Sequence, residues 1–196
     1  DKIVGLSLTP WKDWRPNQYA AYIKALPRLA SLPDVGATDN NDFSIEKVIS
    51  LQPDLVILPA WAYKALGQSI QQLEKANIPI VVLDYNAQTI EKHALSTEIL
   101  GKVMGAENRA QQLIDQYKKA MMEVNNRVEN AKPIQTKVYI EVGSKGAAVF
   151  GNSYANDMWG GIVNQLKADN IAKDRLQKLG PLNPEYVLTR NPDIIF

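Results

Sequence analysis

Aromatic and basic side chains recur in the turn-rich segments that follow several apolar runs of this sequence. These residues are Trp11, Trp14, Arg15, Trp61, Tyr63, Tyr85, Lys145 and Tyr154. Aromatic rings offer flat stacking surfaces, and guanidinium and ammonium groups bind carboxylates or catecholates. The combination favours non-covalent capture of a large, partly planar, anionic ligand such as a metal chelate.

Little else in the sequence could carry out catalysis or hold a bare metal ion. There is no cysteine and a single histidine, His93, which excludes thiolate sites, histidine-rich metal sites and most triad chemistry. The phosphate-binding glycine motifs and the G-x-S-x-G nucleophile motif are also absent. We therefore expect a protein that is not an enzyme, with no catalytic residue, no metal site and no covalent cofactor. The net charge of +1 gives no reason to expect a nucleic-acid partner.

Apolar runs alternate with segments of helical spacing along the chain, which predicts an α/β fold. Strands are predicted at 2–7, 55–58, 80–83, 137–142 and 193–196. Helices are predicted at 17–32 with a break at Pro27, at 45–51 after a Ser44 cap, and at 62–76, 89–105, 106–131, 155–168 and 184–190. A loop is predicted at 150–154. The strand runs are continuous, which is typical of parallel strands that are buried on both faces. Ligands bind beyond the carboxyl ends of such strands, where the aromatic loops would lie. Trp159 has helical spacing and is expected to be a core residue.

The helix predicted at 106–131 is long for a globular protein. Its apolar residues recur near a period of 3.6, and about 25 residues would span roughly 37 Å. Such a helix can join two lobes. We predict an N-terminal lobe at 1–105, an interlobe helix at 106–131 and a partial C-terminal lobe at 132–196.

One short unit occurs twice, once on each side of this helix. IEKVISLQPDLVI at 45–57 matches PEYVLTRNPDIIF at 184–196, with glutamate near the start of each copy and Pro-Asp before the apolar run. The glutamates, Glu46 and Glu185, suit the positive end of a helix, and the aspartates suit a turn. The repetition predicts two lobes of similar construction, each with a parallel sheet.

Several segments resemble a known family. These are VGLS at 4–7, PDVGATDNNDFSIEKVISLQPDLVI at 33–57, NIPIVVLD at 77–84, LGKVMGAENRAQQLIDQYKKAM at 100–121, VFGNSYANDMWGGIVNQLKADNIA at 149–172 and LNPEYVLTRNPDIIF at 182–196. They are similar to periplasmic substrate-binding proteins of ABC importers for iron-siderophores, haem and cobalamin, the class with a single long interlobe helix. The resemblance implies a ligand cleft between two α/β lobes, an ABC permease partner in the inner membrane, and a periplasmic or lipid-anchored extracytoplasmic location.

The resemblance also sets finer expectations. The chain lacks the strand and helix that usually precede VGLS, and the end of the second lobe, so we expect it to be truncated at both ends. Family members often dock permease arginines with one acidic residue per lobe, for which Asp13 and Asp157 are the candidates here. The ligand expected first is a ferric siderophore. Haem, cobalamin or a molybdate-type oxyanion, a chelatase-like enzyme, and a sensory domain that has lost its ligand are the alternatives.

Overall fold

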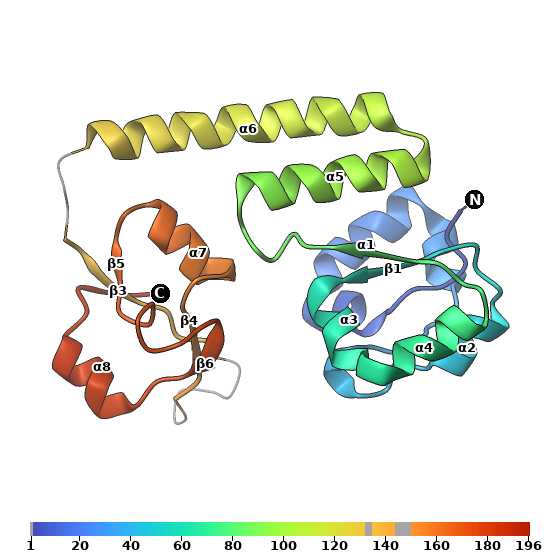
Figure 1. Ribbon diagram of the computed structural model, residues 1–196, viewed down its shortest axis with the longest axis horizontal. Helices are drawn as coiled ribbons and strands as arrows, with labels where there is room; N and C mark the ends of the chain where they lie inside the picture. Colours follow the sequence, from blue (N-terminus) through green and yellow to red (C-terminus); the bar gives the residue numbers. More distant parts are fainter. Residues whose placement is uncertain (1, 132–134, 144–149) are drawn as a thin grey trace. The chain divides into compact units, whose positions relative to one another are not determined.

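The structure, a computed structural model, describes residues 2–131, 135–143 and 150–196. It divides into two compact units, unit 1 at Asp1–Leu83 and unit 2 at Asp84–Phe196. Each unit has its own parallel sheet (Figure 1). Each also has its own hydrophobic core. The α/β class, the parallel sheets and the long helix are therefore confirmed.

Unit 1 is built from short elements around a two-stranded parallel sheet, in which β1 pairs with β2. Its elements are the π-helix η1 (Pro10–Trp14), α1 (Pro16–Ala25), the 3-10 helices η2 (Pro27–Ser31) and η3 (Thr38–Asn40), α2 (Ile45–Ser50), β1 (Val56–Pro59), α3 (Ala60–Leu66), the 3-10 helix η4 (Gly67–Ser69), α4 (Ile70–Lys75) and β2 (Ile80–Leu83). Pro27 separates α1 from η2, as predicted, because proline has no N–H to continue the helical hydrogen bonds.

The core of unit 1 forms where α2 and α4 bring their apolar side chains to β1. Ser44 caps α2 by accepting a hydrogen bond from the backbone N–H of Lys47, which confirms the predicted cap. The core residues of this unit are Val35, Ile45, Val48, Val56, Leu58, Ile70, Leu73 and Ile78. Leu73 is completely buried, so this cluster holds the sheet at one fixed position.

Two predictions about the strands of unit 1 are wrong. Ile57 is 41% exposed between the buried Val56 and Leu58, so β1 is not buried on both faces. Residues 2–7 form no regular strand, because pairing is limited to a parallel bridge from Leu6 to Asp34. The next hydrogen bond of the ladder toward the N-terminus would need a backbone N–H from Pro33, the residue before Asp34. Proline has no N–H, so the ladder cannot continue in that direction.

Unit 2 contains the two longest helices and two small sheets. Its elements are α5 (Ile90–Met104), α6 (Glu107–Asn130), β3 (Lys137–Tyr139), β4 (Asn152–Tyr154), α7 (Met158–Gln165), β5 (Asp169–Asn170), β6 (Leu179–Pro181), α8 (Pro184–Arg190) and β7 (Ile194–Ile195). The parallel sheet has the order β5-β3-β7, and β4 pairs with β6 in an antiparallel ladder.

Helices α5 and α6 run side by side, joined by a tight turn at Gly105 (Figure 1). Gly105 has a φ of +63°, the left-handed conformation that commonly ends a helix at glycine. A Cβ at Gly101 would lie 2.4 Å from the Cβ of Ala110, so the two helices approach closely there. The 24 residues of α6 span roughly 36 Å, close to the length predicted from the extent of the apolar repeat.

The sheets of unit 2 include features that the sequence pattern did not reveal. Residues 152–154 were expected in a loop but form β4, because the long-range pairing to β6 outweighs the turn tendency of Gly, Asn and Ser.

The prediction that Trp159 is a core residue is wrong, since its side chain is 47% exposed on α7. The second copy of the repeated unit forms α8 and β7, as predicted.

Candidate ligand-binding site

The first aromatic loop of unit 1 is fixed to the sheet end by Asp34. One carboxylate oxygen of Asp34 accepts hydrogen bonds from the backbone N–H groups of Leu8 and Gly36, each at 3.0 Å. The loop that carries η1 and the loop that starts at Gly36 therefore leave the bridge between Leu6 and Asp34 together. Both follow the carboxyl ends of parallel segments, the edge at which ligands bind in such folds.

The two tryptophans of η1 have different environments. The ring of Trp11 is half-buried and contacts the edge of Tyr22, with 5.4 Å between the ring centroids and 72° between the planes. Trp14 is 55% exposed, and Arg15 beside it is exposed as well. A separation of three residues thus leaves one ring packed under the loop and the other available for stacking.

The loop between Gly36 and Asp42 forms a tight bend beside α3. Gly36 has a φ of +77°, and a Cβ there would lie 2.1 Å from the carbonyl oxygen of Asp42. The Asp42 carboxylate accepts a hydrogen bond of 2.7 Å from the N–H of Ala37. Partial burial raises the pKa of Asp39, which lies on η3 in this bend.

Trp61 and Tyr63 lie on α3, which begins directly after β1 ends at Pro59. Each of the two side chains is 38% exposed. Two positions along a helix correspond to a rotation of about 200° around its axis. The two side chains therefore leave nearly opposite sides of α3, and their rings cannot form one continuous wall. Together with Trp14, whose segment follows the bridge between Leu6 and Asp34, they give unit 1 three exposed rings.

Tyr85 belongs to a packed aromatic cluster in unit 2. Its ring meets the edge of His93 at 4.8 Å, and His93 stacks on Tyr117 at 4.0 Å between centroids. The Tyr85 hydroxyl lies 3.1 Å from the Oγ1 of Thr97. Burial lowers the pKa of His93, so the imidazole stays neutral at pH 7, which favours the stack. This cluster attaches the start of unit 2 to α5 and α6, and the ligand role of Tyr85 stays a prediction.

Tyr154 lies on β4 and is held by a buried asparagine. Asn170, with no exposed surface, donates from its Nδ2 to the carbonyl oxygens of Tyr154 at 2.9 Å and Ala155 at 2.8 Å. Its Oδ1 accepts from the N–H of Ala172 at 3.0 Å. Burial and the charge of Asp157 raise the pKa of Tyr154, so its hydroxyl remains a hydrogen-bond donor at neutral pH. Lys145 lies outside the described residues.

Sequence reasoning missed Glu141, Asn170 and the exposed surface of Trp159. Glu141 follows β3 and could have been noticed as a carboxylate within an apolar strand. No sequence signal marks Asn170, because its partners lie 15 and 16 residues away. The Trp159 ring packs on Phe196, with 5.6 Å between centroids, and that contact is also invisible in the sequence pattern.

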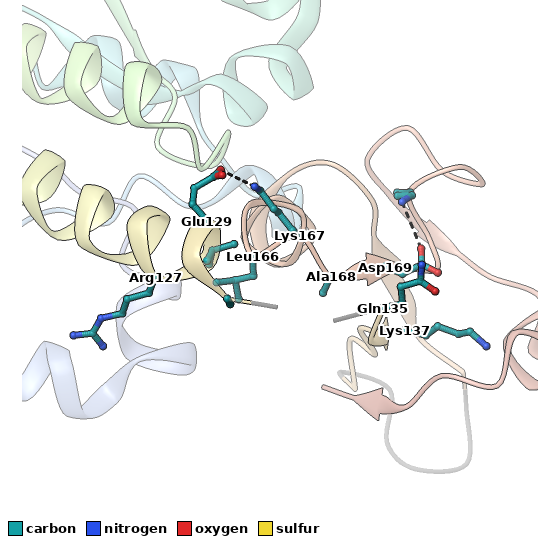
Figure 2. Close-up of a pocket in the computed structure, with 11 residues that line it drawn as sticks. Arg127, Glu129, Gln135, Lys137, Leu166, Lys167, Ala168 and Asp169 are labelled. Atoms are coloured by element: carbon teal, nitrogen blue, oxygen red, sulfur yellow. Dashed lines mark hydrogen bonds and ion pairs between the residues drawn. The ribbon is translucent and has the colours of Figure 1, made fainter. Parts of the chain in front are cut away.

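A cavity of about 810 Å³ in unit 2 is lined by none of these aromatic residues. It is bounded by the end of α6 and by the segment around β5 (Figure 2). Its lining residues are Arg127, Val128, Glu129, Ala131, Gln135, Lys137, Leu166, Lys167, Ala168, Asp169 and Lys173, with no ring among them. Lys167 pairs with Glu129 at 2.6 Å and Lys173 with Asp169 at 3.4 Å, so much of its charge is neutralised internally. We do not assign the ligand to this cavity.

Among residues 2–131, 135–143 and 150–196, no group of three or more acidic, histidine or cysteine side chains could hold a metal ion. None of the helices in the same ranges is long and apolar enough to cross a membrane.

Known proteins resemble this chain along most or all of its length. A family model described as periplasmic binding protein matches residues 1–196. The uncharacterized ABC transporter substrate-binding lipoprotein YvrC of Bacillus subtilis (strain 168) is 27% identical over 199 residues, which cover 100% of this chain and 56% of the relative. The iron(3+)-hydroxamate-binding protein FhuD of the same organism is 27% identical over 157 residues, which cover 76% of this chain and 45% of that protein.

A crystal structure gives the same result. The TroA-like periplasmic binding protein FepB from Veillonella parvula superimposes with a TM-score of 0.82 at 34% identity, covering 98% of this chain and 56% of that one. The chain thus spans about half the length of the relatives it matches. The family is one of binding proteins and not of enzymes, as the sequence predicts. The family match along its whole length shows that the chain belongs to the periplasmic binding protein family.

Proposed function

We propose that this chain is part of the substrate-binding component of an ABC importer and captures a metal chelate, in the first place a ferric siderophore. The observation that carries the proposal is the set of exposed rings on Trp14, Trp61 and Tyr63, on segments of unit 1 that follow the Leu6–Asp34 bridge and strand β1. A relative whose name states iron(3+)-hydroxamate binding supports the choice of an iron chelate. The iron is cargo that arrives inside its chelator, so the protein needs no metal ligands of its own.

The proposed contacts follow from the chemistry of such a ligand. A ferric siderophore presents a large, partly planar surface and often carries negative charge. Stacking on Trp14 and Trp61 would supply contact area, and Arg15 would orient the charge. In unit 2, Tyr154 would add a ring and a hydroxyl donor, and Tyr85 and Lys145 remain expected contacts.

Haem and cobalamin are the alternatives closest to this proposal, because both also present large planar faces to stacking rings. A molybdate-type oxyanion is less suited, since it would need mainly N–H and hydroxyl donors and would leave the exposed tryptophans without a role. A chelatase needs a proton acceptor near the metal. The histidine of this chain stacks on Tyr117 and makes an edge contact with Tyr85, so it is poorly placed for that task.

The proposed location is extracytoplasmic, either free in a periplasm or held by a lipid anchor, with an ABC permease of the inner membrane as partner. The lipoprotein among the relatives supports this proposal. Of the two acidic residues considered for docking, Asp13 is exposed, whereas the Oδ1 of Asp157 is buried without a hydrogen-bond partner among the described residues.

Glu46 and Glu185 are better candidates for docking to the permease. They occupy matching positions in the two copies of the repeated unit, in the first turn of α2 and of α8. Both are exposed, and within the described part of the chain neither carboxylate forms an ion pair. Each unit thus offers one available acidic group at the same place in the repeat, where it can meet an arginine of the permease.

Charge reversal at both positions should separate transport from ligand binding. We expect Glu46→Lys with Glu185→Lys to reduce cellular uptake of a labelled ferric chelate at least about tenfold, because each change replaces an attraction by a repulsion. Chelate affinity should stay within about twofold of the wild type, which corresponds to less than about 0.5 kcal/mol. Reversal of two other exposed glutamates, Glu74 and Glu123, is the control. Normal uptake by the double variant would rule out this docking role.

The function is tested by titrating the full chain while tryptophan fluorescence is recorded. Ferrichrome as a ferric hydroxamate, haem, cobalamin and molybdate are the four probes. Quenching that saturates with a dissociation constant below about 1 µM for ferrichrome supports the proposal. If only another probe binds tightly, that probe replaces the ferric siderophore as the proposed ligand. No response to any of the four probes would contradict the function.

A further inference from the structure

Glu141 joins the end of β3 to the start of β4 through its side chain. One carboxylate oxygen accepts a hydrogen bond from the Tyr139 hydroxyl, and the other accepts from the backbone N–H of Gly151. Tyr139 is only 3% exposed. Burial, together with the hydrogen bond to Glu141 and its charge, raises the pKa of Tyr139, so the phenol stays protonated and donates. Glu141 is therefore held from one side while it holds Gly151 on the other.

The chain at Gly151 fits this arrangement closely. A Cβ there would lie 2.1 Å from the carbonyl oxygen of Val142 and 2.6 Å from the carboxylate of Glu141. The N–H of Val142 also donates to the carbonyl oxygen of Asn152 at 2.8 Å. Because Gly151 has no side chain, its backbone can approach the Glu141 carboxylate closely. The hydrogen bond from Gly151 to Glu141 and that from Val142 to Asn152 together set where β4 begins.

The starting point of β4 decides which way Tyr154 points. Successive residues of a strand face opposite sides, and a slip by one residue exchanges the two faces. In the structure Ser153 is completely buried, while its neighbours Asn152 and Tyr154 keep partial exposure. Asn170 binds the far end of β4, at the carbonyl oxygen of Tyr154. Glu141 is the corresponding anchor at the near end.

We propose that Glu141 is a positioning residue for ligand binding, which acts by fixing β4 so that Tyr154 faces the ligand. The inference rests on the proposed function, because Tyr154 is one of its ligand contacts. Glu141 itself has both carboxylate oxygens engaged within the protein, so it acts on the ligand through Tyr154. Its contribution to affinity should therefore disappear when the Tyr154 side chain is removed.

A double-mutant cycle tests this coupling, with ferrichrome as the probe and the full chain as the protein. We expect Glu141→Leu to weaken binding about tenfold, equivalent to about 1.4 kcal/mol, because the leucine cannot accept from Gly151. Glu141→Gln keeps a carbonyl acceptor and an amide that can donate to Tyr139, so its affinity should stay within about threefold. In a Tyr154→Ala background, Glu141→Leu should cause less than about a twofold further change.

Three results would overturn the proposal. Glu141→Leu could leave affinity unchanged, or it could weaken binding equally with and without Tyr154. Glu141→Gln could weaken binding as much as Glu141→Leu, which would show that an acceptor for the Gly151 N–H does not preserve the site. Glu123→Ala, an exposed site on α6, is the control that should be neutral in both backgrounds.

A ligand-free measurement keeps this inference separate from the proposed function. A wild-type chain that binds none of the probes contradicts the function, and amide hydrogen exchange then decides on Glu141. The Gly151 N–H should exchange faster in Glu141→Leu than in Glu141→Gln, because it has lost its acceptor. Equal exchange in the two variants would show that the carboxylate does not hold β4.

Discussion

Replacement of Asn170 by alanine should destabilise unit 2 by about 3 kcal/mol or more. The side chain, with no exposed surface, bonds the carbonyl oxygens of Tyr154 and Ala155 and the N–H of Ala172. The Ala155 oxygen also accepts from the Nδ2 of Asn164 at 3.0 Å, so the groups that lose this partner are the Tyr154 oxygen and the Ala172 N–H. Each buried polar group that loses its partner costs about 1–3 kcal/mol, and a cavity adds to that loss. Urea unfolding followed by circular dichroism measures the difference. Asn170→Asp should be destabilised as well, since a carboxylate would face two carbonyl oxygens.

Asn126→Ala is the matched control for this change. Asn126 lies on the exposed surface of α6 in the same unit, and surface substitutions usually change stability by less than about 0.5 kcal/mol. A loss below about 1 kcal/mol in Asn170→Ala would mean that water or a shifted backbone replaces the three bonds. Asn170 would then not be the anchor of β4 that the structure indicates.

Replacement of Gly36 by alanine should have an effect of similar size in unit 1. The positive φ of 77° costs a side chain about 1–2 kcal/mol, and the added Cβ would lie 2.1 Å from a backbone oxygen of Asp42. We expect a loss of about 3 kcal/mol or more in unfolding free energy, because the clash is with backbone and not with a flexible side chain. The bend that carries η3 would have to open.

Gly105→Ala isolates the contribution of the clash. Gly105 also has a positive φ, of 63°, in the left-handed helical region, but no atom lies within 4 Å of the position a Cβ would take. It should lose only the conformational part, about 1–2 kcal/mol. Equal losses in the two variants would show that the Gly36 bend adjusts, and that the contact with Asp42 does not restrain the loop.

The sequence pattern predicted helices well because their signals are local. Ser44 caps α2 three residues before its partner Lys47, and Pro27 interrupts the first helical segment where predicted. The period of α6 is contained in its own residues. Strand pairing depends on partners far along the chain, so the ladder between β4 and β6 could not be read from residues 150–154.

The candidate site was predictable only in part, for the same reason. The position of aromatic residues after apolar runs led to the choice of Trp14 and Trp61, which are exposed after the Leu6–Asp34 bridge and after β1. The contact of Tyr85 with His93, which in turn stacks on Tyr117, arises from helix packing, which the pattern does not specify. The two anchors of β4, Glu141 and Asn170, depend on contacts between separate elements.

The central claim, that exposed rings of unit 1 bind a metal chelate, is tested most directly by titrating wild type, Trp61→Ala and Trp159→Phe with ferrichrome. Trp159 is a fair control because it is also exposed, at 47% against 38% for Trp61, but is not among the proposed contacts. We predict saturable binding to the wild type, affinity at least about tenfold weaker in Trp61→Ala, and little change in Trp159→Phe. Equal affinities of Trp61→Ala and wild type for the chelate would contradict the account.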